Sequence, residues 1–85
     1  MKLEELAKKM GRRIKELRAR RGLTQEEMEE FGIPYKYYQR IESPGSHPAN
    51  LTLKTLLKIA AALEVEVSEL FEFADVKRKK EKPKA

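Results

Sequence analysis

The sequence predicts a small all-α protein of five helices, and three observations lead to this fold class. Apolar side chains recur at steps of three and four residues, the spacing that places them on one stripe of an α-helix. Glycine, proline or a capping hydroxyl residue stands between these stripes, where helices end and begin. The 85 residues make one domain at most, and a hydrophobic content of 40% is enough for one modest core.

The first predicted helix covers about residues 3–20. Its apolar stripe consists of Leu3, Leu6, Ala7, Met10, Ile14 and Leu17. Gly22 follows where helix ends favour glycine, and the arginines at positions 18, 20 and 21 suit the negative end of the helix dipole. The chain is therefore expected to turn at Gly22.

A short second helix is expected to start at Thr24. Thr24 is a natural N-cap, and Glu27 completes a capping box with it. Met28 and Phe31 supply the inward side, and Gly32 ends the helix after about seven residues. The glutamates of this segment are expected to serve capping and solubility, because carboxylates near a helix N-terminus usually do so.

The third helix is expected to cover residues 34–42, with Pro34 at its first position, where the missing N–H costs nothing. Two short helices joined by a tight link with glycine at the bend are typical of a DNA-reading helix-turn-helix. Residues 24–42 are therefore predicted to form this motif from the second and third helices.

The remaining elements follow a loop, residues 43–49, that holds two prolines and a glycine. Thr52 is expected to cap a fourth helix. The apolar stripe of that helix is Leu53, Leu56, Leu57, Ala60 and Leu63. Ser68 caps a last short helix that carries Leu70, Phe71 and Phe73.

The formal net charge of +5 belongs to the end of the chain, because residues 77–85 hold six basic residues and one acidic residue. We therefore expect a DNA-binding domain over residues 1–76 and a basic, disordered tail over residues 77–85. The tail is either simply solvated or adds sequence-independent affinity for DNA by releasing counterions.

Several classes of protein are not expected. Cysteine is absent and His47 is the only histidine, so neither disulfides nor a metal site are predicted. We expect no cofactor and no enzymatic activity, because no nucleophile with a base and no phosphate-binding glycine loop occurs. No apolar stretch approaches the roughly 20 residues that span a bilayer, so a soluble, cytoplasmic protein without a membrane partner is expected.

The strings GRRIKELRARRGLTQEE, YYQRIE, LTLKTLLKIAAALEV and SELF together resemble the Cro/C1-type (XRE, lambda-repressor-like) helix-turn-helix family. The resemblance covers about residues 10–71. It implies a five-helix domain that lays its third helix in the major groove of double-stranded DNA and places the start of its second helix on a phosphate. It also implies that Arg18 and Glu42 form a structural ion pair between the first and third helices.

The resemblance and the helix spacing together suggest which side chains touch DNA. Lys36 and Arg40 are four residues apart and hence on one face, with Gln39 beside Arg40, while Tyr38 and Ile41 match inward positions. The predicted base contacts are Tyr35, Lys36, Gln39 and Arg40. The predicted phosphate contacts are Thr24, Gln25, Tyr37, Ser46, His47 and Asn50.

Some of these assignments leave an alternative open. Tyr35 and Tyr37 suit packing as well as DNA contact, and His47 suits a solvated loop as well as a phosphate contact. Two segments also depart from the family pattern, since the second helix is shorter than usual and the loop after Glu42 is longer. We expect the packing of the second helix on the third to differ accordingly.

The leading functional hypothesis is a sequence-specific transcriptional regulator, foremost a repressor, that acts as a homodimer on two half-sites. Phe71 and Phe73 are the predicted dimer interface. The rival hypothesis is a protein-binding module, such as an antitoxin that holds a toxin partner, and small members of the family also include restriction-modification controllers.

Overall fold

The computed structural model describes residues 1–73, which form three α-helices and two 3-10 helices and contain no strand. The elements are α1 (Leu3–Arg21), η1 (Glu26–Phe31), α2 (Tyr35–Glu42), α3 (Leu53–Leu63) and η2 (Val67–Phe71). The all-α prediction is therefore confirmed, and the five expected helices correspond approximately to these three α-helices and two 3-10 helices. The predicted tail at residues 77–85 lies outside the described residues.

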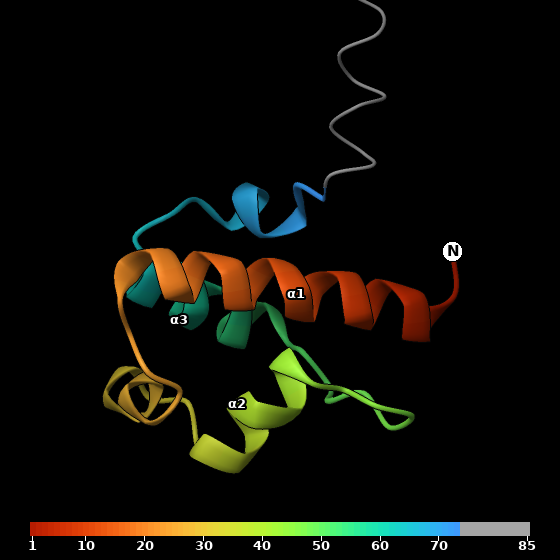
Figure 1. The fold of residues 1–85 in the computed structure, drawn as a ribbon, viewed down its shortest axis with the longest axis horizontal. Helices are drawn as coiled ribbons and strands as arrows, with labels where there is room; N and C mark the ends of the chain where they lie inside the picture. The colour runs from red at the N-terminus through yellow and green to blue at the C-terminus, as the bar shows by residue number, and fades with distance from the viewer. Residues whose placement is uncertain (74–85) are drawn as a thin grey trace, which may run out of the picture.

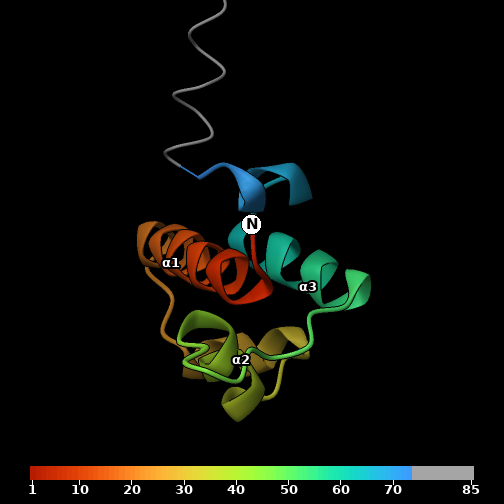
Figure 2. The same cartoon turned by 90° about the vertical axis from the view of Figure 1, so that its right-hand side faces the viewer.

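The elements form three layers (Figures 1 and 2). The longest helix, α1, lies beside α3 in the middle layer, η2 covers one side of this pair, and η1 with α2 covers the other. Every element contributes to one core, whose fully buried large side chains are Ile14, Met28, Ile33, Tyr38, Ile59 and Leu70. The core thus fixes η1 and α2 against the middle layer.

Three arginines of α1 connect it to three other elements. Arg13 donates from Nε to the carbonyl oxygen of Glu69 in η2 at 2.9 Å. Arg18 pairs with Glu42 of α2 at 2.6 Å, and Arg21 donates to a backbone carbonyl of α3 at 3.3 Å. The arginines near the end of α1 therefore do more than complement its dipole.

At Gly11, in the interior of α1, the backbones of α1 and α2 lie close together. A Cβ atom added to Gly11 would lie 2.6 Å from the carbonyl oxygen of Glu42 and 2.8 Å from that of Ile41. Real Cβ atoms do not come this near to backbone oxygens. The last residues of α2 therefore pack where only glycine fits.

Several helix boundaries agree with the sequence prediction. Gly22 ends α1 in the left-handed conformation, with φ of 74°. Thr52 caps α3 by accepting a hydrogen bond from the Thr55 N–H at 3.1 Å. Pro34, by contrast, stands just before α2 with ψ of 140°, so the prediction that it opens the helix is wrong by one residue.

The second helical segment is a 3-10 helix of six residues instead of an α-helix. Its N–H groups bond to carbonyls three residues earlier, as in Met28 to Gln25 at 3.2 Å and Gly32 to Glu29 at 3.0 Å. A 3-10 helix rises about 2.0 Å per residue, against about 1.5 Å for an α-helix. The six residues of η1 therefore span about 12 Å, the length of about eight residues of α-helix.

The predicted inward stripes are wrong at three leucines. Leu53 and Leu57 of α3 are 79% and 63% exposed, whereas Ile59 and Ala62 are fully buried. Apolar residues fill all but three positions of α3, so periodicity alone could not decide which side faces the core. Leu3 is 71% exposed because α1 extends beyond the elements that it packs on (Figure 1).

Phe73 belongs to the core instead of an open surface. Its side chain is 8% exposed and joins the cluster that also holds Leu70. This burial leaves little of the Phe73 ring open to a second copy of the chain, and the predicted dimer contact at Phe73 stays a prediction. Phe71 is 41% exposed and could still meet another molecule.

Candidate nucleic-acid interface

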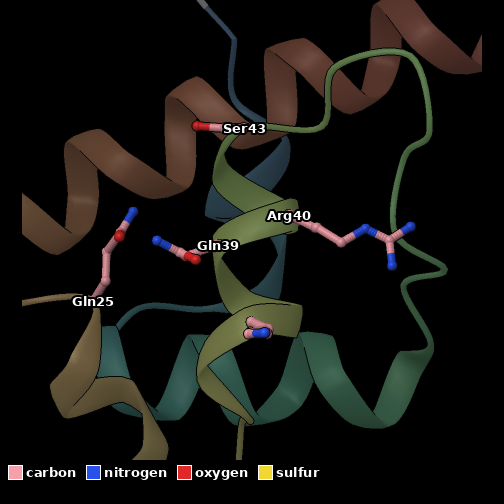
Figure 3. Close-up of a pocket in the computed structure, with 5 residues that line it drawn as sticks. Gln25, Gln39, Arg40 and Ser43 are labelled. Carbon is pink, nitrogen blue, oxygen red and sulfur yellow. The ribbon is translucent and has the colours of Figure 1, made fainter.

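The helix α2 has one buried and one open side. Tyr38 and Ile41 are buried, while Lys36, Gln39 and Arg40 are exposed and Tyr35 is half-buried. An open surface hollow at this helix is lined by Gln25, Lys36, Gln39, Arg40 and Ser43 (Figure 3). Three of the four predicted base-contacting residues thus line one hollow. We call Tyr35, Lys36, Gln39 and Arg40 the readout face.

Two side chains of the readout face point to opposite sides of α2 (Figure 3). Gln39 points toward Gln25, and its Nε2 donates to the Tyr35 hydroxyl at 2.9 Å. Arg40 extends toward the loop that follows α2, where Nη2 donates to the His47 carbonyl at 3.1 Å. Arginine carries five N–H donors, so Arg40 keeps donors for another acceptor.

The start of the η1 segment lies on one flank of α2. Thr24 and Glu27 form the predicted capping box, since the Thr24 N–H donates to Glu27 Oε1 at 2.8 Å and the Glu27 N–H donates to Thr24 Oγ1 at 3.1 Å. Gln25 donates from Nε2 to Glu42 Oε1 at 2.9 Å. This predicted phosphate contact therefore already has one internal partner.

The loop after α2 lies on the other flank and is fixed by Tyr37. The Tyr37 hydroxyl donates to the Asn50 carbonyl at 2.7 Å and lies 3.2 Å from Thr55 Oγ1. Ser46 Oγ lies 3.1 Å from His47 Nδ1. Ser46, His47 and Asn50 are exposed, whereas half-buried Tyr37 holds the loop in place. A structural role for Tyr37 is thus visible, beside the phosphate role expected from sequence.

Glu42, the last residue of α2, joins this helix to α1 and to the start of the η1 segment. Its carboxylate receives hydrogen bonds from Arg18 Nε at 2.6 Å and Arg18 Nη2 at 3.1 Å, and also from the Tyr38 hydroxyl and Gln25 Nε2. Arg18 Nη1 also donates to the Leu23 carbonyl at 2.7 Å. The ion pair that the family resemblance implies is therefore present and extended by two further donors.

This cluster is buried, since the side chain of Glu42 is 1% exposed and that of Arg18 is 14% exposed. Burial alone would raise the pKa of Glu42, but the hydrogen bonds from Arg18, Tyr38 and Gln25 outweigh it and hold the pKa below its ordinary value. Burial and the hydrogen bond to Glu42 raise the pKa of Tyr38. Glu42 is therefore a carboxylate with neutral tyrosine and cationic arginine partners.

Sequence reasoning missed a cap on the N-terminus of α2. The Tyr35 N–H donates to Glu29 Oε2 at 3.1 Å, so a side chain from η1 caps the next helix. A carboxylate is favoured at a helix N-terminus, but the six-residue separation gave no local capping pattern. Glu29 at one end and Glu42 at the other fix the position of α2.

Residues 1–73 contain no group of three or more histidine, aspartate or glutamate side chains placed to hold a metal ion. Within the same residues, every helix is too short or too polar to cross a membrane.

Comparisons with known proteins point to the same part of the chain. A family model described as helix-turn-helix matches residues 14–70. Among solved structures, the chain is similar to the restriction-modification controller protein C.AhdI from Aeromonas hydrophila, with 36% sequence identity and a TM-score of 0.68. The match covers 76% of this chain and 96% of C.AhdI. No curated protein matches the chain.

Proposed function

The chain belongs to the helix-turn-helix family of DNA-binding transcriptional regulators, and from this premise we propose that it reads a specific sequence with the readout face of α2. The observation that carries the proposal is the exposure of Lys36, Gln39 and Arg40 on a short helix that is fixed at both ends. The proposal assigns binding to the chain and no catalytic step.

The side chains of the readout face suit direct recognition of bases in the major groove. Arg40 can fork onto O6 and N7 of guanine, and Gln39 can fork onto N6 and N7 of adenine. Lys36 can donate to guanine acceptors. The internal bonds of Gln39 and Arg40 orient these side chains before DNA arrives, which lowers the entropic cost of binding.

The two flanks of α2 suit contacts to the phosphates that border the groove. Gln25 lies on one flank, and the loop with Ser46, His47 and Asn50 lies on the other (Figure 3). Contacts of this kind position a protein on the duplex without specifying sequence. We propose that Thr24 and Gln25 contact phosphates of one DNA strand and that the loop residues contact phosphates of the other.

The proposal predicts that Arg40→Ala and Lys36→Ala each weaken binding to the preferred site by about 1–3 kcal/mol and relax the preference for particular bases. The site is first enriched from a randomised duplex library, and binding is then measured for that site and for an unrelated duplex. Lys54→Ala, which removes an exposed cation from the start of α3, serves as a charge-matched control. Unchanged sequence preference in both readout variants would contradict the proposal.

We also propose that the chain acts as a homodimer, because one short helix reads few base pairs whereas two copies read half-sites about 34 Å apart. Phe71 stays the candidate interface residue. Phe71→Asp is therefore expected to shift the sedimentation coefficient from dimer to monomer. Leu57→Asp is the comparison, since Leu57 is an exposed leucine on a different element. A dimer that survives Phe71→Asp but not Leu57→Asp would place the interface on α3.

The biological setting proposed is the control of restriction-modification genes, with repression as the expected direction. The likeness to the controller C.AhdI over 96% of that protein supports this setting. Transcription from a promoter that carries the preferred site should fall when the chain is added to purified polymerase. A rise would identify an activator and would overturn only the direction of control. A toxin partner stays a prediction from the sequence.

A further inference from the structure

Two groups of three stand out among the eight cations of α1. Arg13, Arg18 and Arg21 bond to η2, α2 and α3 respectively, as described above. Lys8, Arg12 and Lys15 are exposed and have no hydrogen-bond or ion-pair partner among residues 1–73. Their spacing of four and three residues places them on one side of the helix. We call Lys8, Arg12 and Lys15 the basic stripe.

The basic stripe adjoins the C-terminal end of α2. Gly11 packs against the carbonyl of Glu42, and Arg18 bonds to the Glu42 carboxylate. Lys15 is four residues after Gly11 and three before Arg18, so it lies on the same side of α1 as these two contacts. Ser43, the next residue after α2, lines the hollow and is drawn close to α1 in Figure 3. Lys15 thus lies on α1 close to the end of α2 that carries Ser43.

The charge and length of the stripe suit a run of phosphates. The acidic residues near it are Glu4 and Glu5, about one turn before Lys8, and Glu16. Glu5 already accepts a hydrogen bond from the Lys2 N–H, and Glu16 is bonded to Arg13 and Arg20. Seven residues separate the first and last cations, about 10 Å at 1.5 Å per residue. This is the rise of about three base pairs along one DNA strand.

We propose that the basic stripe binds the phosphate backbone of the same DNA duplex, beyond the C-terminal end of α2. The inference rests on the proposed function, and it adds a third set of phosphate contacts on α1 to those on the two flanks of α2. Because these cations meet no base edge, they contribute affinity and register without sequence preference.

The test is the variant Lys8→Ala with Arg12→Ala and Lys15→Ala, studied with the enriched duplex and with an unrelated duplex. Alanine is the best helix former, so α1 is expected to stay helical. The slope of log K against log salt concentration should become less steep by about 2–3, since each lost phosphate contact contributes about 0.9. Binding to both duplexes should weaken by the same factor, which leaves the specificity ratio unchanged.

Single variants separate a local contact from a simple loss of net charge. Arg20 is seven residues after Arg13, hence on the side of α1 that faces η2, and its side chain is 63% exposed. Lys15→Ala should lower the slope by about 1, whereas Arg20→Ala should leave it unchanged. Equal effects of the two single variants would overturn the inference.

The remaining outcomes distinguish this inference from the proposed function. If the natural chain binds the enriched duplex and the triple variant keeps the same slope, the basic stripe does not touch DNA although the proposed function stands. The basic stripe would then be a candidate binding surface for an acidic protein partner. If the natural chain enriches no duplex and binds none, the proposed function fails and the inference fails with it.

Discussion

Glu42→Gln is expected to lower the free energy of unfolding by about 3–5 kcal/mol, the usual cost of removing one partner from a buried ion pair. The Glu42 side chain is 1% exposed, so the change leaves the Arg18 guanidinium buried without its counter-charge. A small domain has only about 5–15 kcal/mol of stability, and each kilocalorie shifts its melting temperature by roughly 4–8 °C. Thermal unfolding followed by circular dichroism measures the effect.

A double-mutant cycle with Arg18→Met isolates the ion pair. Once Glu42→Gln has removed the charge, Arg18→Met should cost little more, so the two losses should be far from additive. Tyr38 does not require the negative charge, because the amide oxygen of the introduced glutamine can still accept its hydroxyl hydrogen bond. Additive single losses of less than about 1 kcal/mol would show that the pair behaves like an exposed one.

The pH dependence of stability is a second test of the Arg18–Glu42 ion pair. The folded-state pKa of Glu42 lies below its ordinary value of 4.5, so its stabilising contribution is complete above that value. The contribution is lost as pH falls through the folded-state pKa. The difference in stability between the natural chain and Glu42→Gln should therefore shrink in acid, below about pH 4.

Local signals in the sequence were enough to predict most helix ends. Gly22, the Thr24–Glu27 capping box and the Thr52 cap each depend on residues within one turn, and each forms as predicted. The Arg18–Glu42 pair is a contact across 24 residues, and only the family resemblance implied it. Short-range chemistry is thus readable from one sequence, whereas distant contacts required a known pattern.

The features that were missed depend on how whole elements dock. The facing side of α3 is ambiguous in a nearly continuous apolar helix, and the positions of α1, η1 and η2 decide that Leu57 stays outside. The cap from Glu29 requires η1 to lie at the start of α2. The hydrogen bonds from Gln25 to Glu42 and from Tyr37 to Asn50 likewise follow from packing. The predicted contacts of Gln25 and Tyr37 with DNA phosphates are to be tested by substitution.

Gly11→Ala is the other substitution with a large expected effect. It is expected to lower the free energy of unfolding, whereas the same substitution at an exposed helix position raises it. In an exposed helix interior, replacing glycine by alanine stabilises by about 1 kcal/mol. At Gly11 the new Cβ would lie 2.6 Å from the carbonyl oxygen of Glu42, a backbone atom that moves only if α1 and α2 separate. We expect a net loss of about 1–3 kcal/mol, typical of an overpacked core, and a larger loss for Gly11→Val.

Gly11→Ala should also displace the readout face, because the atoms that must move belong to the last residues of α2. Gly11→Ala is therefore expected to weaken binding to the enriched duplex even at temperatures where the variant is fully folded. Lys15→Ala, one turn away, controls for alanine in α1, and its loss should be confined to the salt-dependent part of binding. A more stable Gly11→Ala variant with unchanged DNA affinity would mean that α1 and α2 do not approach as closely as the structure has them. Gly11 would then not be required for the position of α2.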